Sequence, residues 1–373
     1  MKKEGLIMKK FFTLLMTAIF AFLVCGCFSS ESTKAENIAE EKIDPVEEKL
    51  KTMTLEEKIG QMMLIGVQEK KFDENASYML NVYHVGGIIL YDRNMDTKEQ
   101  VKKLTDDLQA NSKIPLFIAL DEEGGRVSRM KHAIAPPPSQ ELIGRSGDFN
   151  LAKTHAVDTA KKLKEIGVNI NFAPVADVGN YERSFGTDAN MVANFVSQAA
   201  KGYESENVFY CLKHFPGIGK ATIDPHKDIS EVEVSKEILE AEDLPPFKKI
   251  ISEQDNSKFM VMLGHLKYLA LDKENSASLS HEIVTNLLRK ELNFQGVIIT
   301  DDLEMGAISK YNDSESIGIQ AVKAGADILL ICHNYETQKK VCDAILKKVQ
   351  SGEISEDRIN ESVRRILKMK LAL

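Results

Sequence analysis

The segment at residues 213–226 (KHFPGIGKATIDPH) contains the two side chains best suited to proton transfer. Asp224 and His226 are two residues apart, and in an extended segment this spacing places both side chains on the same side of the chain. A carboxylate bonded to one imidazole nitrogen fixes the tautomer and raises the basicity of the ring, which leaves the other nitrogen free for general acid/base work. Taken alone, the D-x-H pattern is weak evidence, because helix caps and surface loops also contain it.

A second segment, at residues 296–305 (GVIITDDLEM), ends an apolar run with adjacent acids. Alternation along a strand sends Asp301 and Asp302 to opposite sides, so only one of them should face the axis of a closed sheet. We expect Asp301 to be that residue. A carboxylate in this position could attack an anomeric carbon as a nucleophile.

Eight short apolar runs rich in Ile and Val are expected to be the strands that position these groups. Continuous hydrophobicity, without alternation, is typical of parallel strands that are covered on both faces. The runs are residues 59–67, 85–91, 115–121, 168–176, 207–214, 259–265, 295–301 and 326–332. Helical periodicity between them predicts helices that include residues 98–111, 150–165, 191–205, 281–292 and 314–324.

Eight strand-plus-helix units in about 300 residues predict an α/β fold, a single (β/α)8 TIM-type barrel. A doubly wound open sheet is the alternative, but the first strand-to-helix turn lacks G-x-G-x-x-G. Six of the eight runs end in, or are followed by, polar or ionisable residues: 92–94, 121–123, 177, 213–214, 265 and 301–302. One such residue could merely cap a helix, whereas six at the same barrel mouth indicate an active site.

The amino-acid composition and net charge exclude several classes of protein and make a nucleic-acid partner unexpected. The chain has 373 residues, 43% hydrophobic and 28% charged, with a formal net charge of −8. These values exclude a disordered tail, a collagen-like repeat and a disulfide-dense miniprotein. An acidic chain without a long basic block is not expected to bind nucleic acid, and a neutral or weakly charged substrate fits better.

The N-terminus predicts export. Lys9 and Lys10 precede an apolar run at residues 11–24, which is too short for a comfortable transmembrane helix and is typical of a signal peptide. Gly26 before Cys27 resembles the bacterial lipoprotein box, which implies acylation of Cys27 and loss of residues 1–26. Secretion without lipid is the alternative, and Met8 competes with Met1 as the start.

The predicted parts are therefore a lipoprotein signal peptide (1–26), a flexible polar tether (27–48) and the barrel domain (49–373). Three cysteines would remain in the folded part, at positions 211, 332 and 342. Three cysteines are few and odd in number, so we do not expect a disulfide framework. They also lack C-x-x-C spacing, so no structural zinc site is expected.

Seven segments together resemble glycoside hydrolase family 3, and in particular its bacterial β-N-acetylhexosaminidase branch. The resemblance runs from about Thr54 to the C-terminus, with the pieces in the family's order: VGGIILYDRN, ALDEEGGRVSRM, INFAPVADV, RSFGTDA, KHFPGIGKATIDPH, GVIITDDLEMGAI and AGADILLIC. It implies a retaining exo-β-N-acetylglucosaminidase that works through a covalent glycosyl-enzyme, with no metal and no organic cofactor. The implied substrates are peptidoglycan fragments, such as muropeptides, or related aminosugar chains.

The resemblance also implies roles for individual residues. Asp301 aligns with the nucleophile, and His226 with the acid/base of this branch, with Asp224 as its dyad partner. Five further positions match residues that bind the sugar: Asp121, Arg129, Arg183, Lys213 and His214. Charged donors and acceptors at strand ends suit the recognition of hydroxyl groups. Arg129 and Arg183 could instead form only ion pairs.

The sequence departs from the family pattern in one loop. Ile218 stands where the family usually has His, Lys220 where it usually has Asp, and Pro225 where Ser or Thr is more usual. None of the three is an expected catalytic residue, so the departures bear on loop geometry and substrate preference. His265, at the end of the sixth run, is expected to be packed, and it is the next candidate acid/base after His226.

Two other functions compete. A β-glucosidase of the same family typically takes its acid/base Glu from an additional C-terminal domain, and we expect none here, because the chain ends shortly after RRIL at residues 364–367. A sugar-binding lipoprotein that has lost catalysis is disfavoured by the joint presence of Asp224, His226 and Asp301. We expect an exported monomeric enzyme, held by lipid on the extracytoplasmic face of the cell membrane. Whether water or phosphate is the acceptor stays undecided.

Overall fold

Eight parallel strands close into a barrel in the computed structural model, which describes residues 44–131, 134–220, 231–309 and 313–373. The order around the ring follows the order along the chain, and the last strand pairs with the first. The strands are β1 (Met63–Gly66), β2 (Gly87–Ile89), β3 (Phe117–Leu120), β6 (Ile170–Asn171), β7 (Phe209–Phe215), β9 (Phe259–Leu263), β11 (Val297–Asp302) and β12 (Ile328–Ile331). This topology confirms the predicted (β/α)8 barrel, and each strand extends at most one residue beyond its predicted run.

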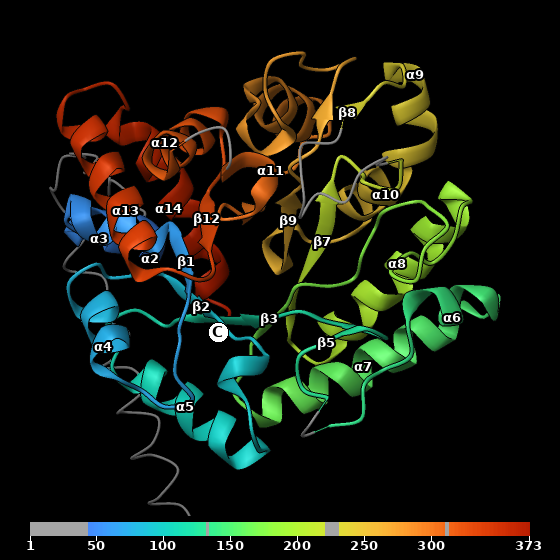
Figure 1. Cartoon of the computed structure of the whole chain (residues 1–373), viewed down its shortest axis with the longest axis horizontal. Coiled ribbons are helices and arrows are strands. Elements are labelled where there is room, and N and C mark those ends of the chain that lie inside the picture. The colour runs from blue at the N-terminus through green and yellow to red at the C-terminus, as the bar shows by residue number, and fades with distance from the viewer. Residues whose placement is uncertain (1–43, 132–133, 221–230, 310–312) are drawn as a thin grey trace, which may run out of the picture. The chain divides into compact units, whose positions relative to one another are not determined.

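Helices surround the strands, as Figure 1 shows. The helices are α2 (Pro45–Thr52), α3 (Leu55–Gln61), α4 (Glu74–Asn81), α5 (Lys98–Ala110), α6 (Gln140–Arg145), α7 (Phe149–Glu165), α8 (Ala189–Ser205), α9 (Lys236–Ile238), α10 (Pro245–Glu253), α11 (Gly306–Ser309), α12 (Ser314–Ala324), α13 (Tyr335–Gln350) and α14 (Glu356–Lys370). Three short 3₁₀ turns, η1 (Asp92–Asn94), η3 (Asn256–Lys258) and η4 (Ala277–Leu279), and two π-helical segments, η2 (Leu239–Asp243) and η5 (Glu282–Glu291), complete the set. The five helices expected from periodicity are present within two residues of their predicted bounds.

Local sequence explains these helices. In α5 the Thr97 side chain accepts a hydrogen bond from the backbone N–H of Gln100, which caps the helix. Val101, Leu104 and Leu108 follow at helical spacing and are buried, so they turn one face of α5 to the barrel. Two small sheets lie outside the barrel: the hairpin of β4 (Glu122–Gly124) and β5 (Val127–Ser128), and the pair β8 (Glu231–Val232) and β10 (Lys267–Tyr268).

The barrel strands are buried along almost their entire length. Every residue of the eight strands is buried except Asp301, which is partly exposed. Strands covered on both faces explain why the apolar runs in the sequence are continuous and do not alternate. Asp301 is therefore the most exposed residue of the barrel strands.

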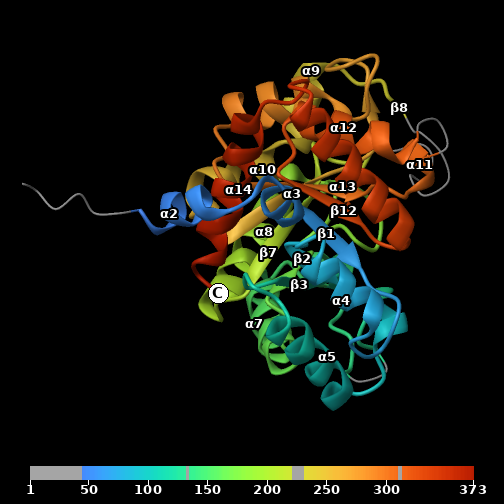
Figure 2. The ribbon, with the colours of Figure 1, turned by 90° about the vertical axis from the view of Figure 1, so that its left-hand side faces the viewer.

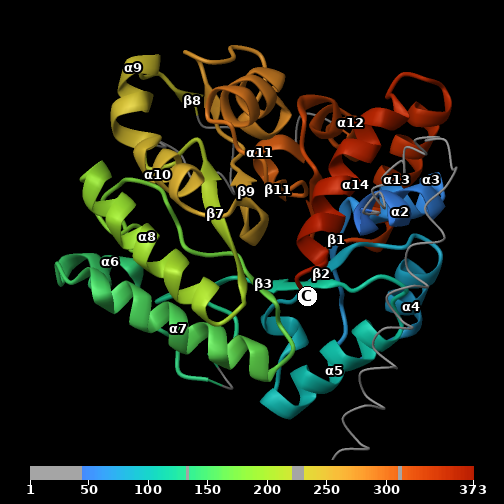
Figure 3. The ribbon, with the colours of Figure 1, turned by 180° about the vertical axis from the view of Figure 1, so that it is seen from behind.

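The last helix, α14, packs beside the barrel against α2 and α3, which lie at the start of the described residues (Figure 3). Helix α2 begins at Pro45, inside the segment 27–48 that we expected to be tether. Asp44 caps it by accepting from the backbone N–H of Val46, and proline is favourable at the first helical position. Figure 2 shows α2 and α11 on opposite sides of the barrel. The predicted signal peptide and Cys27 lie outside the described residues.

Among the helices of the described part of the chain, none has the length and apolar character needed to cross a membrane.

A buried carboxylate, Asp327, lies just before β12 and binds side chains of η5 and α14. It accepts from Arg289 of η5 at 2.8 Å, from Arg365 of α14 at 2.9 Å and from the Ser362 hydroxyl at 2.6 Å. Its side chain is fully buried. Burial alone would raise the pKa of Asp327, but the arginines outweigh it and hold the pKa below its ordinary value.

We predict that Asp327→Asn lowers the free energy of unfolding by about 3–5 kcal/mol, because it leaves two partly buried arginines without their counter-charge. Chemical denaturation measures the change. The matched control is Asp106→Asn, which breaks a surface pair with Lys102 and should cost less than about 0.5 kcal/mol. Since the pKa of Asp327 is lowered on folding, its contribution is complete above the unfolded pKa of about 3.9 and is lost as the pH falls through the folded value. Similar losses in the two variants near neutral pH would contradict this role for Asp327.

Candidate active site

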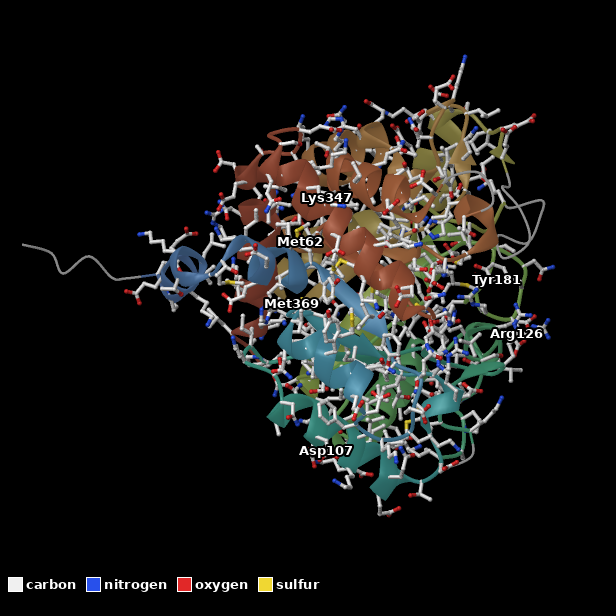
Figure 4. The ribbon with its side chains drawn as sticks, turned by 60° about the vertical axis from the view of Figure 1, so that its left-hand side comes forward. Met62, Asp107, Arg126, Tyr181, Lys347 and Met369 are labelled. Carbon is white, nitrogen blue, oxygen red and sulfur yellow. The ribbon has the colours of Figure 1, made fainter. Side chains whose placement is uncertain are left out.

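A cavity of about 370 Å³ lies at the carboxyl ends of the barrel strands. Its walls come from the segments that follow β2, β3 and β12 and from the ends of β7 and β11. Its lining residues are Tyr91, Asp121, Glu123, Val127, Arg129, Arg183, Lys213, His214, Asp301, Asp302, Glu304, Met305, Gly306 and His333. Figure 4 shows Arg126 and Tyr181, from loops on this side, at the opposite end of the molecule from Met62 and Met369.

Lys213 is the centre of a charged network on one wall of the cavity. Its ammonium donates to Asp121 Oδ1 at 2.7 Å and lies 2.6 Å from Glu123 Oε1. Arg183 donates to both oxygens of Glu123, through Nε at 2.7 Å and through a terminal nitrogen at 2.8 Å. The side chains of Lys213 and Glu123 are each only 2% exposed, so these charges are held in fixed positions for a ligand.

The ion pairs determine the protonation states of the acidic and basic side chains in this wall. Burial alone would raise the pKa of Asp121, but Lys213 and Arg129 outweigh it and hold the pKa of this carboxyl well below its usual range. The pKa of Glu123 is lowered in the same way, against burial, by Lys213 and Arg183. Burial would lower the pKa of Lys213, yet the two carboxylates raise it. All of these groups are charged near neutral pH, and they offer several donors and acceptors to hydroxyl groups.

The β4–β5 hairpin holds Arg129 against this wall. Glu122 accepts from the Ser128 hydroxyl and from the backbone N–H groups of Arg129 and Met130, the latter two at 3.0 and 3.3 Å. Gly124 turns the hairpin with a φ of +96°, and a Cβ there would lie 2.3 Å from the Pro138 carbonyl oxygen. The Arg129 guanidinium donates to Asp121 at 3.1 Å and lies over the Tyr91 ring, 5.0 Å from its centroid.

His214 is oriented by Asp177, which follows β6. Its Nδ1 lies 2.8 Å from Asp177 Oδ2, and Arg183 donates to its Nε2 at 3.2 Å. Because a guanidinium only donates, Nε2 accepts, so Nδ1 carries the proton and donates to Asp177. Asp177 also accepts from Tyr181 and from the backbone N–H of Ile218. Burial would raise the pKa of Asp177, but the His214 ring and the backbone N–H groups of Ile218 and His214 lower it.

Asp301 and Asp302 differ sharply in their contacts. Asp301 is partly exposed, and its Oδ1 accepts from the backbone N–H of Asp302 at 2.8 Å. Asp302 is buried and accepts from the backbone N–H groups of Glu304 and Cys332, at 3.1 and 3.2 Å. Both line the cavity, but Asp301 has the more accessible carboxylate, which is the property a nucleophile needs.

His265 uses both of its ring nitrogens elsewhere. Its Nδ1 lies 2.8 Å from the Ser278 hydroxyl, and its Nε2 donates to the Asp302 carbonyl at 2.9 Å. The ring is buried, which lowers the pKa of His265, and it does not line the cavity. This arrangement fits a packed histidine and leaves neither nitrogen facing a ligand.

The loop that departs from the family pattern is anchored within the structure as far as Lys220. The Lys220 ammonium donates to the buried Asp243 of η2 at 2.5 Å and lies 3.2 Å from Glu242. Ile218 donates its backbone N–H to Asp177 at 2.9 Å, and Tyr268 donates to the Gly217 carbonyl at 2.6 Å. The charge reversal at position 220 is therefore matched by an acidic partner.

Residues 54–369 match the family described as "Glycosyl hydrolase family 3 N terminal domain". The chain belongs to glycosyl hydrolase family 3. This membership confirms the family that the seven sequence segments predicted.

Two curated relatives of this family 3 chain are named beta-hexosaminidase. Beta-hexosaminidase A of Pseudoalteromonas piscicida is 32% identical over 335 residues, which cover 80% of this chain and 55% of that protein. Beta-hexosaminidase of Haemophilus influenzae (strain Rd) is 31% identical over 290 residues, covering 75% of this chain and 82% of that protein. The chain thus spans about half the length of the first relative and most of the second.

Two solved structures have the same fold. A family 3 beta-N-acetylglucosaminidase from Paenibacillus sp. superimposes with a TM-score of 0.83 at 37% identity, covering 86% of this chain and 62% of that one. A family 3 member from Mycobacterium smegmatis superimposes with a TM-score of 0.79 at 29% identity, covering 86% of this chain and 98% of that one.

In this family 3 chain the cavity brings together six of the eight residues predicted for catalysis and sugar binding: Asp121, Arg129, Arg183, Lys213, His214 and Asp301. Asp224 and His226 lie outside the described residues. Sequence reasoning left out Glu123, Asp177 and His333. Asp177 stood out as a polar strand end, but no pattern showed that it pairs with His214. In the described part of the chain, no three His, Cys, Asp or Glu side chains are grouped as metal ligands.

Proposed function

We propose that this chain is a retaining exo-β-N-acetylglucosaminidase that acts on peptidoglycan fragments or related aminosugar chains. The observation that carries the proposal is the accessible carboxylate of Asp301 in the same cavity as the Lys213 network. The names of the similar proteins, beta-hexosaminidase and beta-N-acetylglucosaminidase, support the aminosugar. The cavity volume falls within the range of small-molecule sites, roughly 300–1,000 Å³.

In the proposed reaction the cavity wall binds the terminal sugar. Asp121 and Glu123 can accept from hydroxyl groups, and Arg129 and Lys213 can donate to them. Because buried ion pairs hold the Lys213 network in place, little reorganisation is needed when the sugar enters. The wall thereby fixes the anomeric carbon next to Asp301.

The chemistry then takes two steps. A carboxylate oxygen of Asp301 forms a bond to the anomeric carbon as the glycosidic C–O bond breaks, and His226 gives its proton to the departing oxygen. In the second step a water gives a proton to His226 and its oxygen attacks the anomeric carbon, which releases Asp301. Two inversions retain the configuration. Asp224 orients the His226 ring and stabilises its charged form.

A pair of chromogenic substrates tests the proposal. We expect 4-nitrophenyl β-N-acetylglucosaminide to be cleaved with a kcat/KM at least about 100-fold above that of the matching β-glucoside, because a polar group of the site is left unpaired without the acetamido group. NMR of the fresh product should show the β-anomer first. Equal activity on both substrates would support the β-glucosidase, and no activity on either would support a binding protein.

We also propose that Cys27 carries lipid and holds the enzyme on the extracytoplasmic face of the membrane. The support is the sequence alone, where Gly26 precedes Cys27 after a basic and apolar segment. We predict that Cys27→Ser moves the protein from the membrane to the soluble fraction, as measured by immunoblotting of fractions. Cys25→Ser is the matched control, since position 25 would be lost with the signal peptide. Membrane retention of the Cys27 variant would count against the anchor.

A further inference from the structure

A series of polar contacts lies directly behind Asp301 and involves a histidine that the mechanism above does not use. His333 follows β12, lines the cavity, and its Nε2 lies 3.3 Å from Asp302 Oδ2. Its Nδ1 lies 3.3 Å from a terminal nitrogen of Arg93. Arg93 in turn donates to the carbonyl oxygens of Val67 and Cys332, at 3.0 and 2.7 Å. The series therefore connects the ends of β1, β11 and β12.

The donors and acceptors of this series define the state of the ring. Arg93 can only donate, so Nδ1 of His333 accepts and Nε2 carries the proton that faces Asp302. The backbone of the same residue is also held, because its N–H donates to Glu304 Oε2 at 2.6 Å. The ring stands 5.4 Å from the Tyr91 ring. The His333 side chain is 53% exposed, and its contacts through both ring nitrogens and the backbone N–H hold it at the cavity wall.

Side-chain contacts help to hold the backbone next to Asp301, together with His265, whose Nε2 donates to the Asp302 carbonyl at 2.9 Å, and the Leu303 N–H, which donates to the Leu330 carbonyl at 2.9 Å. The register between β11 and β12 shifts between Ile299 and Asp302, so regular strand pairing does not fix the peptide that joins Asp301 to Asp302. The Asp302 carboxylate ties this region to β12 by accepting from the Cys332 backbone N–H at 3.2 Å. The backbone N–H of Asp302 then donates to Asp301 Oδ1 at 2.8 Å. A rotation of the Asp302 backbone would therefore also shift the Asp301 carboxylate.

We propose that His333 is a positioning residue, which holds Asp302 so that the Asp302 amide aims the Asp301 carboxylate at the anomeric carbon. This role rests on the proposed function of Asp301. It assigns His333 no contact with the reacting atoms and no proton transfer to the substrate.

Charged groups surround the His333 ring and affect its pKa. This pKa can therefore be used to test the contact between His333 and Asp302. Asp302 and Glu304 are the acids beside it, Arg93 is the cation, and Tyr91 contributes a neutral ring. The hydrogen bond to Asp302 raises the pKa of His333, while burial and Arg93 act against it. Protonation at Nδ1 would break the contact with Arg93, so the pKa reports the balance between the two partners.

Steady-state kinetics on the chromogenic N-acetylglucosaminide test the role. His333→Phe keeps a ring and removes both nitrogens, and we expect kcat to fall about 10- to 100-fold with KM within about 2-fold, because a misaimed nucleophile slows chemistry and leaves sugar binding intact. His333→Gln supplies an amide donor and should recover at least half of that loss on a logarithmic scale. The matched control is His281→Phe, an exposed histidine on η5's N-terminal side, which should match wild type. A raised KM with unchanged kcat would overturn positioning and indicate direct contact with the ligand.

A second measurement does not depend on activity. In ¹⁵N-histidine NMR titrations we expect Asp302→Asn to lower the pKa of His333 by about one unit, since an attractive charge is removed. An unchanged pKa in that variant would overturn the inference. The two proposals fail differently: a wild-type protein that cleaves no N-acetylglucosaminide refutes the proposed function, whereas an active wild type with an equally active His333→Phe variant refutes positioning alone.

Discussion

Asp301→Ala should reduce kcat on the N-acetylglucosaminide by about 10⁴-fold or more, because no carboxylate remains to form the glycosyl-enzyme. The fold should survive, since Asp301 is partly exposed and its side chain accepts one hydrogen bond from its neighbour. Equal melting temperatures of variant and wild type would check this. Turnover above about 1% of wild type would contradict the assignment of Asp301.

Chemical rescue sharpens this prediction. Azide can enter the space left by the carboxylate in Asp301→Ala and attack the anomeric carbon of an activated glycoside from the same side. The expected product is the α-glycosyl azide, because one inversion replaces two. Asp302→Asn is the matched control: it keeps the carboxylate of Asp301, so it should lose activity more moderately and form no azide adduct. Rescue of the Asp302 variant instead would place the nucleophile one residue later.

The second large effect is expected at His226, which is proposed to give and take the proton. His226→Ala should slow glycosides with poor leaving groups severely, whereas an activated aryl glycoside, whose departing oxygen needs little protonation, should still form the glycosyl-enzyme readily. A free imidazole titrates near neutrality, whereas a carboxylic acid would need a raised pKa for this task. The measurement is a series of aryl glycosides with graded leaving-group pKa.

Pre-steady-state kinetics complete that test. In His226→Ala the water loses its general base, so deglycosylation should limit the rate and a burst of phenol should precede the steady state. Asp224→Ala should show a weaker form of the same pattern, since Asp224 orients the ring without moving the proton. Equal slowing of activated and unactivated substrates, with no burst, would make His226 a binding or structural group.

Much of the fold could be predicted because barrel strands carry a strong local signal. A strand buried on both faces is mostly apolar, so β9 and the first part of β7, before Lys213, were readable as continuous apolar runs. The β4–β5 hairpin gave no such signal, because its five residues are mostly polar and depend on Glu122 accepting from Ser128 and from two backbone N–H groups. The first turn of α2, residues 45–48, was assigned to the tether because it is as polar as a linker, yet it belongs to a helix that packs against α14.

Most of the residues that line the cavity could be predicted from the sequence. The side chains with which they form hydrogen bonds and ion pairs could not. Arg183 was predicted to bind sugar, and it does line the cavity, but it also holds Glu123 through two hydrogen bonds. These residues are 60 positions apart, and the pairing of β3 with β6 brings the segments that carry them together. The same holds for His214 with Asp177, and for His333 with Asp302. Pairing across strand ends is set by tertiary geometry, which a single sequence does not display.

Covalent trapping tests the central claim most directly. A slow fluorinated N-acetylglucosaminide, in which fluorine destabilises the oxocarbenium-like transition states, should accumulate as the glycosyl-enzyme in the wild-type protein. Mass spectrometry of the intact chain should show one added sugar. Peptide mapping should then place it on Asp301, the partly exposed acid of β11. A label on Asp302 or Glu304, or no covalent adduct while hydrolysis proceeds, would contradict the proposed mechanism.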